Sequence, residues 1–265
     1  MLSICATPIG NLDDVTLRVL EELRSAELVL AEDTRHTRIL LDRHGLRPSL
    51  LSFHQHNEAS RVAELLPRLV AGARVALVSD AGMPLVSDPG ARLVRAAIDA
   101  GVKVTVLPGP SAVEAALVLS GQAGSGYAFA GFLPRRAGEL GSLWAEIAGR
   151  PYPTVAFESP QRLPATLRSL AERDPEVPVA VCRELTKHFE EVVRGTAAEV
   201  AERFTEPPRG EITLVVGPFR TGPDEAAARA ALADLVDAGT PRRVAADVVA
   251  RLTGLSRNAL YRDSL

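Results

Sequence analysis

The sequence has little cysteine, few aromatic residues and no long apolar stretch. Only Cys5 and Cys182 are cysteines, and both lie in apolar, strand-like segments far apart in the chain. We therefore expect two buried thiols rather than a disulfide framework. Aromatic residues make up 4% of the 265 residues, so the core must be built from Val, Leu, Ile and Ala. No apolar run reaches the ~18 residues of a membrane span, and no leader-like segment precedes the first expected strand, so we expect a cytoplasmic protein with no membrane contact.

The sequence has no large excess of positive or negative charge, and several standard site motifs are absent. The formal charge is −3, so any binding of nucleic acid must come from local basic patches. The chain contains no G-x-G-x-x-G after its first expected strand and no G-x-x-x-x-G-K-[ST], which argues against Rossmann and P-loop nucleotide sites. It also lacks C-x-x-C, H-E-x-x-H and G-x-S-x-G motifs. His54 and His56 have no third ligand nearby, so no metal site is expected.

The first half of the chain alternates short apolar runs with amphipathic ones. The runs at 2–6, 27–31, 49–53, 73–79 and 103–107 predict strands. Helical spacing predicts helices at 14–26, 37–45, 58–72 and 89–100, with the helix at 58–72 bent or broken at Pro67. This rhythm predicts the α/β fold class, with a mainly parallel sheet covered by helices.

Two Gly-rich and Pro-rich segments, 120–127 and 217–224, suggest domain boundaries. Between them the rhythm resumes, with strands expected at 127–132, 154–158, 177–183 and 212–217 and helices at 160–173 and 196–205. We therefore expect an α/β domain over 1–121, a second one over 122–220 and a helical tail over 224–265. The tail is expected to contain a helix, a turn at Gly254 and a second helix.

Polar loops follow the expected strands of the first half: TPIGN, EDTRHT, HQHNE, DAGMP and PGPSA. In a parallel sheet these loops share one edge, which is where open α/β sheets bind ligands. The segment LVSDAGMPLVSDPG (77–90) contains Ser-Asp twice. Asp80, with Gly82 beside it, suits a ligand that carries hydroxyl or amine groups. The second copy is expected to start a helix, with Ser87 or Asp88 as the cap and Pro89 in the first turn.

Eight segments occur in an order that resembles a known family: TPIGNLDDVTLRVLEEL, AEDTRHTRILL, HNE, LVSDAGMPLVSDPG, LPGPSA, GFLPRR, RELTKHFEE and RGEITLVV. Over residues 1 to 217 the chain resembles the ribosomal RNA small subunit methyltransferase I branch of the tetrapyrrole methylase superfamily. The resemblance implies two α/β domains with S-adenosylmethionine in the cleft between them, and a homodimer. It implies 2′-O-methylation of a cytidine in the decoding region of 16S rRNA, on free RNA or on the small ribosomal subunit.

The resemblance also assigns the cofactor contacts to particular residues. In the first half they are Pro8, Ile9, Gly10, Asp80, Ala81, Gly82, Met83, Pro108, Gly109, Ser111 and Ala112; in the second half they are Phe157, Glu158, Gly210 and Glu211. The family usually has Thr where this chain has Met83, so any contact made by a Thr hydroxyl is lost. Methyl transfer from a sulfonium needs no metal, and much of the catalysis can come from alignment.

The acceptor, a ribose hydroxyl, is a poor acid, so a general base would help. Glu32 and Asp33 are the candidates, and the sequence does not choose between them. The basic segment 35–47 and the residues after the expected strand at 127–132 offer phosphate contacts. The substrate candidates are Arg35, His36, Arg38, His54, Asn57, Arg135 and Arg136, with Arg43 and Arg47 equally consistent with a solvated helix face. Phe53 and His54 are candidates for stacking on a base.

Three functions remain open from the sequence. The first is the rRNA methyltransferase. The second is a corrinoid-precursor methylase of the same superfamily, which has no need of EDTRHT or of the RNALY segment in the tail. The third is a non-catalytic RNA-binding protein that uses the tail, where residues 240–265 carry five Arg and two Asp. A terminal helix pair without an RNA role explains that tail equally well.

Overall fold

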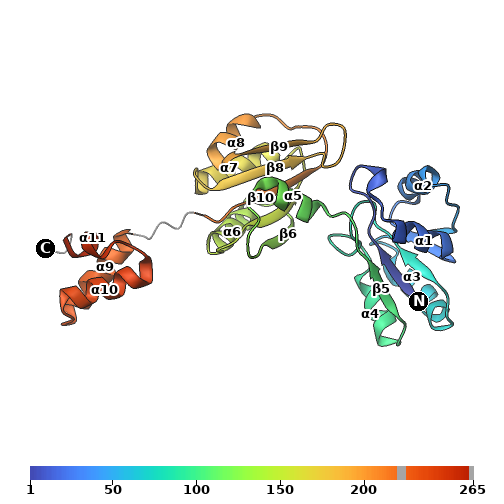
Figure 1. Cartoon of the computed structure of the whole chain (residues 1–265), viewed down its shortest axis with the longest axis horizontal. Helices are drawn as coiled ribbons and strands as arrows, with labels where there is room; N and C mark the ends of the chain where they lie inside the picture. Colours follow the sequence, from blue (N-terminus) through green and yellow to red (C-terminus); the bar gives the residue numbers. More distant parts are fainter. Residues whose placement is uncertain (220–224, 263–265) are drawn as a thin grey trace. The chain divides into compact units, whose positions relative to one another are not determined.

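The structure is a computed structural model that describes residues 1–219 and 225–262. The chain divides into two compact units, Met1–Pro218 and Phe219–Leu265. The first unit contains two five-stranded sheets, and the second is helical (Figure 1). This is the α/β class with a helical tail that the sequence predicts. No helix among the described residues is long and apolar enough to cross a membrane.

The first sheet is parallel throughout, with the strand order β3-β2-β4-β1-β5. Its strands are β1 (Leu2–Cys5), β2 (Leu28–Ala31), β3 (Leu50–Ser52), β4 (Val75–Leu77) and β5 (Val104–Leu107). The helices between them are α1 (Leu17–Ser25), α2 (Thr34–Arg43), α3 (Glu58–Val70) and α4 (Ala91–Asp99), and a short 3-10 turn, η1, spans Leu12–Asp14. Because every connection is a crossover, the loops after the strands meet at one edge of the sheet.

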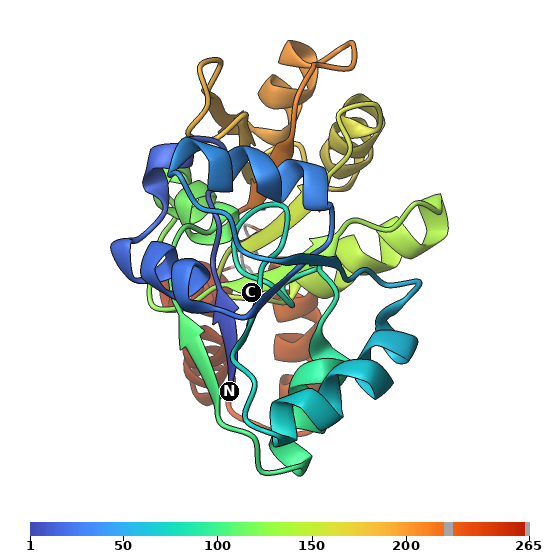
Figure 2. The same ribbon diagram turned by 90° about the vertical axis from the view of Figure 1, so that its right-hand side faces the viewer.

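Successive side chains of a strand point to opposite faces of the sheet and so pack against different helices. In β2, Leu28 and Leu30 pack with the buried residues of α3 and α4. Val29 and Ala31 face the other way and pack with those of α1 and α2. Figure 2 shows the blue helices α1 and α2 on one side of the strands and the cyan and green helices α3 and α4 on the other. A sheet buried on both faces explains why its strands read as continuous apolar runs.

The second sheet is mixed, with the order β6-β7-β10-β8-β9. Only β6 and β7 pair in parallel, and the other three pairings are antiparallel. Its strands are β6 (Ala128–Phe132), β7 (Thr154–Glu158), β8 (Pro178–Arg183), β9 (Glu191–Thr196) and β10 (Ile212–Val216). Its helices are α5 (Ala112–Ser120), α6 (Ala137–Ala148), α7 (Leu163–Arg173) and α8 (Ala197–Arg203). The sequence patterns did not predict α5, α6 or β9; β9 is only half-buried and polar at both ends.

The expected start of the helix near residue 89 is wrong. Helix α4 begins at Ala91, and its cap position is Gly90, which has a φ of 130°. The carboxylate of Glu58, from the start of α3, accepts hydrogen bonds from the backbone N–H groups of Gly90 and Arg92, each at 3.1 Å. A distant carboxylate therefore satisfies the helix terminus, which leaves Ser87 and Asp88 without a capping role.

Two other helix details differ from expectation. Helix α2 starts at Thr34, three residues earlier than expected, because Asp33 caps it. Helix α3 continues through Pro67, so the helix is not broken there.

Helix α5 connects the two sheets, because it precedes the expected boundary at 121 but packs against the second sheet. Val113, Ala116 and Leu117 share a buried cluster with residues of β7, β8 and β10. The thiol of Cys182 in β8 lies 3.8 Å from the carbonyl oxygen of Ala116, and both cysteines are free and buried, as expected. Ile9, from the loop after β1, belongs to the same cluster. The boundary at residue 121 stays a prediction.

The second unit has a small core of its own. It consists of α9 (Glu225–Asp237), α10 (Arg242–Thr253) and α11 (Arg257–Arg262). Ala228, Leu232, Ala246, Val249 and Leu260 pack together between the three helices. Gly254 ends α10 in a left-handed conformation, with a φ of 73°, so the predicted helix, turn and helix are confirmed. The expected linker extends over 217–224, of which 220–224 lie outside the described residues.

Candidate active site

A cavity of ≈ 540 Å³ lies at the edge of the first sheet, and both sheets contribute to its lining. Three groups come from the first half of the chain: Ile9 and Glu32, the loop after β4 (Asp80–Met83 and Val86–Asp88), and the start of α5 (Ser111–Val113). The second half contributes Phe132, the segment 157–160, Leu185 and the segment 210–213. The volume is that of a site for a small molecule or cofactor.

The first wall is held by contacts between the loops after β1 and β4. Thr7 and Gly82 form an isolated bridge, with backbone hydrogen bonds of 2.8 and 3.1 Å. The Thr7 hydroxyl also donates to the carbonyl oxygen of Ser79 at 3.0 Å. Gly82 has a φ of 77°, and a Cβ there would lie 3.4 Å from Ile9. Gly82 therefore provides the positive-φ turn at which these loops meet.

On the first wall, three carboxylates from two loops line the cavity: Glu32 after β2, and Asp80 and Asp88 after β4. Asp80 Oδ1 accepts a hydrogen bond of 3.0 Å from the backbone N–H of Asp33. Burial and the charge of Asp80 raise the pKa of Glu32. Burial, followed by the charges of Glu32 and Asp80, raises the pKa of Asp88 to about 7. Two carboxylates with raised pKa values in one cavity are typical of a functional site.

Asp33, one of the two expected bases, does not line the cavity. Its carboxylate caps α2 and accepts a hydrogen bond of 2.8 Å from the backbone N–H of Arg35. It also pairs with the Arg35 guanidinium at 2.7 Å. These contacts hold the pKa of Asp33 well below its usual range. Of the expected pair, only Glu32 faces the cavity.

On the second wall, Glu158 belongs to a buried polar network. Its side chain is fully buried and pairs with Arg162, and it accepts a hydrogen bond of 2.5 Å from the Thr166 hydroxyl. Arg162 also donates to the carbonyl oxygens of Leu133 and Pro134. The Glu158 carboxylate therefore ties β7 to α7 and to the loop after β6, and its side chain is occupied within the protein.

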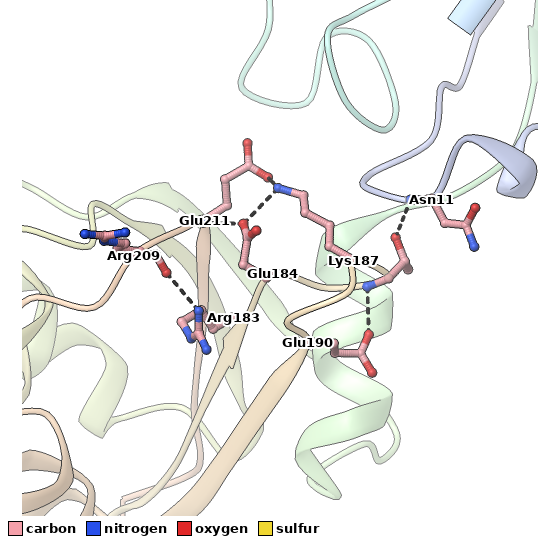
Figure 3. A network of polar contacts seen from close by, with 8 residues as sticks. Asn11, Arg183, Glu184, Lys187, Glu190, Arg209 and Glu211 are labelled. Atoms are coloured by element: carbon pink, nitrogen blue, oxygen red, sulfur yellow. Dashed lines mark hydrogen bonds and ion pairs between the residues drawn. The ribbon is translucent and has the colours of Figure 1, made fainter. Parts of the chain in front are cut away.

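The segment Glu184–Glu190 links the second wall to the loop after β1 (Figure 3). Glu184 and Thr186 both have positive φ, at 51° and 63°. The Thr186 hydroxyl accepts a hydrogen bond of 2.9 Å from the backbone N–H of Asn11. Lys187 pairs with Glu184 and Glu211 at 2.9 and 2.8 Å. These bonds hold a strained segment, and Leu185 within it lines the cavity.

Two glycines permit this close packing. A Cβ at Gly10 would lie 2.6 Å from the carbonyl oxygen of Leu185, and one at Gly210 would lie 2.5 Å from Cδ of Glu184. Gly210 also has a φ of 97°. The family motifs around residues 10, 184 and 210 therefore act together in the fold.

The structure brings most of the expected cofactor residues into one cavity. Those lining it are Ile9, Asp80, Ala81, Gly82, Met83, Ser111, Ala112, Phe157, Glu158, Gly210 and Glu211. Pro8 and Gly10 border neighbouring depressions, and Pro108 and Gly109 are not among the lining residues. At Gly109 a Cβ would lie 3.0 Å from Ala6, so this glycine is needed for packing beneath the site.

Several lining residues were not predicted from the sequence. They are Val86, Ser87, Asp88, Val113, Phe132, Ser159, Pro160, Leu185, Ile212 and Thr213. The sequence did contain a signal for Asp88, because this acidic residue follows the same strand, β4, as Asp80. The pattern typical of a helix start outweighed that signal.

Five of the seven expected RNA contacts are exposed on the protein surface, and none of the seven lines the cavity. Arg35, His36 and Arg38 are exposed on α2, and Arg135 and Arg136 are exposed after β6. Arg136 pairs with Glu139 at 3.0 Å, and Arg43 pairs with Asp13 at 3.0 Å. Asn57 is engaged locally, where its side chain accepts a hydrogen bond of 2.8 Å from the backbone N–H of His54.

The stacking prediction for Phe53 is wrong. Its side chain is fully buried in the core between the first sheet and α3 and α4, so no base can reach it. Over 1–219 and 225–262, no cluster of His, Cys, Asp and Glu side chains could hold a metal ion.

Comparisons with known proteins match this architecture. The family model for Tetrapyrrole (Corrin/Porphyrin) Methylases matches residues 1–201. The chain belongs to the tetrapyrrole methylase family. This methylase is 44% identical over 264 residues to Ribosomal RNA small subunit methyltransferase I of Mesorhizobium japonicum, across 98% of this chain and 90% of that protein. It is 41% identical to the protein of the same name from Neisseria meningitidis serogroup A, across 98% and 91%.

Solved structures show the same fold at low sequence identity. The methyltransferase CobJ superposes with a TM-score of 0.63 at 20% identity, over 82% of this methylase and 93% of that chain. Uroporphyrin-III C-methyl transferase from Thermus thermophilus, solved with S-adenosyl homocysteine, superposes with a TM-score of 0.56 at 21% identity, over 81% and 96%. The predicted fold type is therefore confirmed for residues 1 to about 218.

Proposed function

We propose that this methylase transfers a methyl group from S-adenosylmethionine to the 2′-hydroxyl of a cytidine in the decoding region of 16S rRNA. The observation that carries the proposal is the cavity lined from both sheets. It combines carboxylates with small-residue loops, in a chain that is 44% identical to rRNA methyltransferases over nearly its whole length.

The lining of the cavity fits the chemistry of S-adenosylmethionine. This cofactor carries a sulfonium, an amino group and ribose hydroxyls, which Asp80 and its neighbouring backbone groups can hold. Its adenine needs apolar surface, which Ile9, Phe157 and Leu185 supply on facing walls. The open approach at Gly82, where φ is positive, lets the backbone come close to the ligand.

Met83 replaces a Thr of the family and supplies apolar surface rather than a hydroxyl. It packs partly buried against the core between the first sheet and α3 and α4, and it lines the cavity. We expect it to contribute packing around the cofactor.

When bound, S-adenosylmethionine supplies an electrophilic methyl group, and the protein supplies alignment and exclusion of water. The buried ties at Thr7–Gly82 and Glu158–Arg162 make the two walls rigid, as alignment of an acceptor oxygen requires. Of the two bases expected from the sequence, Glu32 lines the cavity, whereas Asp33 caps α2 and does not line it.

Arg35, His36 and Arg38 on α2, His54 and Asn57 after β3, and Arg135 and Arg136 after β6 are the proposed RNA contacts. The exposed Arg242 and Arg243 of α10 are further candidates. Each phosphate contact should make binding weaken with salt, so charge-removing variants should reduce the salt dependence of RNA affinity. The homodimer and the cytoplasmic location also belong to the proposal, and light scattering on the purified protein tests the first.

Two alternatives make different predictions. A corrinoid-precursor methylase would bind S-adenosylmethionine but leave rRNA unmodified, and the high identity to proteins named as rRNA methyltransferases favours the RNA substrate. A non-catalytic RNA-binding protein would not bind the cofactor, so calorimetry with S-adenosylmethionine separates it from both methylases. Mass mapping of 16S rRNA from a deletion strain, with and without complementation, then tests the substrate. Retention of every ribose methylation in the deletion strain would contradict the proposal.

A further inference from the structure

The loop Leu85–Gly90 is shaped to hold one side chain in the cavity. Leu85 and Ser87 have φ values of 72° and 70°, a conformation that costs about 1 kcal/mol or more at a residue other than glycine. Asp88 lies between Ser87 and Pro89, and proline restricts the backbone of the residue before it. The backbone of Asp88 is therefore restrained on both sides.

The same loop cannot be explained as a helix start, since Glu58 already caps α4. It is not a passive surface turn either. A Cβ at Gly90 would lie 2.7 Å from Leu77, so the end of the loop is pressed against β4. Its strain is maintained by packing, while Asp88 lines the cavity and is only partly exposed. Strain kept at a cavity is typical of a functional position.

Asp88 lies near the opening of the cavity. Its neighbours Val86 and Ser87 are exposed and line the cavity, as does Phe132, which is 64% exposed at the end of β6. The exposed lining residues, which also include Ala81 and Glu211, mark the open part of the cavity, and a large acceptor must enter there because an RNA strand cannot pass through the buried walls. A hydroxyl brought in from that side meets Asp88 beside the carboxylates of Glu32 and Asp80.

We propose that Asp88 is the catalytic residue that takes the proton of the acceptor hydroxyl, and that Glu32 and Asp80 tune it. This inference rests on the proposed methyl transfer. The hydroxyl oxygen forms a bond to the methyl carbon as the bond from that carbon to sulfur breaks, and the sulfur leaves as a neutral thioether. The hydroxyl proton passes to a carboxylate oxygen of Asp88 and then to solvent. No other reactant is needed.

The charged groups around the cavity support this assignment. Glu32 and Asp80 add negative charge beside Asp88, while the Ser79 hydroxyl acts in the opposite direction. On the facing wall, Glu158 and Glu211 are paired with Arg162 and Lys187. With a pKa of about 7, Asp88 can hold a proton and release it near neutral pH, which suits a general base.

The test compares Asp88→Asn with Glu32→Gln. Asparagine keeps the size of Asp88 and removes its proton acceptor. We expect Asp88→Asn to bind S-adenosylmethionine within about 3-fold of the wild type by calorimetry and to lower the single-turnover rate by about 10²-fold or more. In the wild type the rate should rise with pH through an inflection near 7, and Asp88→Asn should lose that inflection. Glu32→Gln should keep it, displaced to lower pH, because one negative charge beside Asp88 is removed.

A second readout does not depend on turnover. Carbon NMR of the protein labelled at its Asp carboxyl carbons, without cofactor, should show one resonance that titrates near pH 7, is absent in Asp88→Asn and moves to lower pH in Glu32→Gln. Loss of the kinetic inflection in Glu32→Gln, or its persistence in Asp88→Asn, would overturn the assignment. So would titration of Asp88 near pH 4. If the wild type itself fails to methylate rRNA, the proposed function fails, while the NMR titration still decides the proton affinity of Asp88.

Discussion

The backbone N–H of Asp33 donates a hydrogen bond of 3.0 Å to Oδ1 of Asp80, joining the loops after β2 and β4. This bond fixes the Asp80 carboxylate in the cavity while the Asp33 side chain turns away to cap α2. A backbone contact at one residue thus orients the functional group of another, and the acidic pair Glu32 and Asp33 divides into one cavity residue and one structural residue.

Substitutions at Asp80 should separate its hydrogen bond from its charge. Asp80→Asn keeps an oxygen that can accept from Asp33, whereas Asp80→Ala leaves that N–H without its partner. We expect cofactor affinity to fall further in Asp80→Ala, by about 5-fold to 30-fold relative to Asp80→Asn, the equivalent of about 1–2 kcal/mol. Calorimetry measures both. Equal affinities in the two variants would show that the bond to Asp33 does not support the site.

Glu158 should matter for stability more than for a direct cofactor contact. Glu158→Gln leaves Arg162 without its buried partner, and we expect it to lower the free energy of unfolding by about 2–4 kcal/mol. Glu139→Gln is the control, because its ion pair with Arg136 is exposed and should contribute less than about 1 kcal/mol. Denaturant titration compares them. A loss of stability no larger than that of the control would contradict the network described here.

Gly10 should be required for the contact between the first loop and the segment Glu184–Glu190. In Gly10→Ala the new methyl group would collide with the backbone oxygen of Leu185, so one cavity wall must move. We expect cofactor affinity to fall by at least about 10-fold. Gly124→Ala serves as the control, since nothing lies within 4 Å of its Cβ position. Cofactor affinity in Gly10→Ala that equals the control would show that the wall tolerates this displacement.

Asp88 should make stability depend on pH. Its folded pKa of about 7 lies above the unfolded value of about 4, so the wild type loses stability as pH rises from about 4 to 7. Asp88→Asn removes this loss. Its stability advantage should be smallest below pH 4, grow through this window and stay constant above it, reaching about 2 kcal/mol after an allowance for partial exposure. Denaturant titrations at several pH values give the curve, and a constant difference across pH would refute the raised pKa.

The sequence predicted the regular parts of this fold well, because the spacing of apolar residues along the chain reflects which side chains are buried. All five strands of the first sheet follow from apolar runs, and the loops after them follow from parallel topology. The mixed second sheet was harder to predict, since β9 is half-buried and polar at both ends and so contains no long apolar run. Helix α5 is apolar on nearly every side, so its residues show no amphipathic pattern.

The site residues were predictable only where the chemistry of the side chain and the surrounding sequence motif both indicate a ligand-binding role. Asp80 and Gly82 follow a strand directly, and both line the cavity. Asp88 was assigned to a helix cap because Ser-Asp-Pro-Gly is typical of a helix start, and only tertiary contact shows that Glu58 takes that role. Phe53 illustrates the reverse case, because a residue at the end of a strand can be buried as completely as one inside it.

The most direct measurement uses small ribosomal subunits purified from a strain that lacks this methylase. The purified protein and methyl-labelled S-adenosylmethionine are added, the 16S rRNA is digested, and the fragments are weighed. The proposal predicts one added methyl group on the ribose of a single cytidine in the decoding region, and none without the protein. A label found on a base, spread over many sites, or absent while the cofactor binds would contradict it.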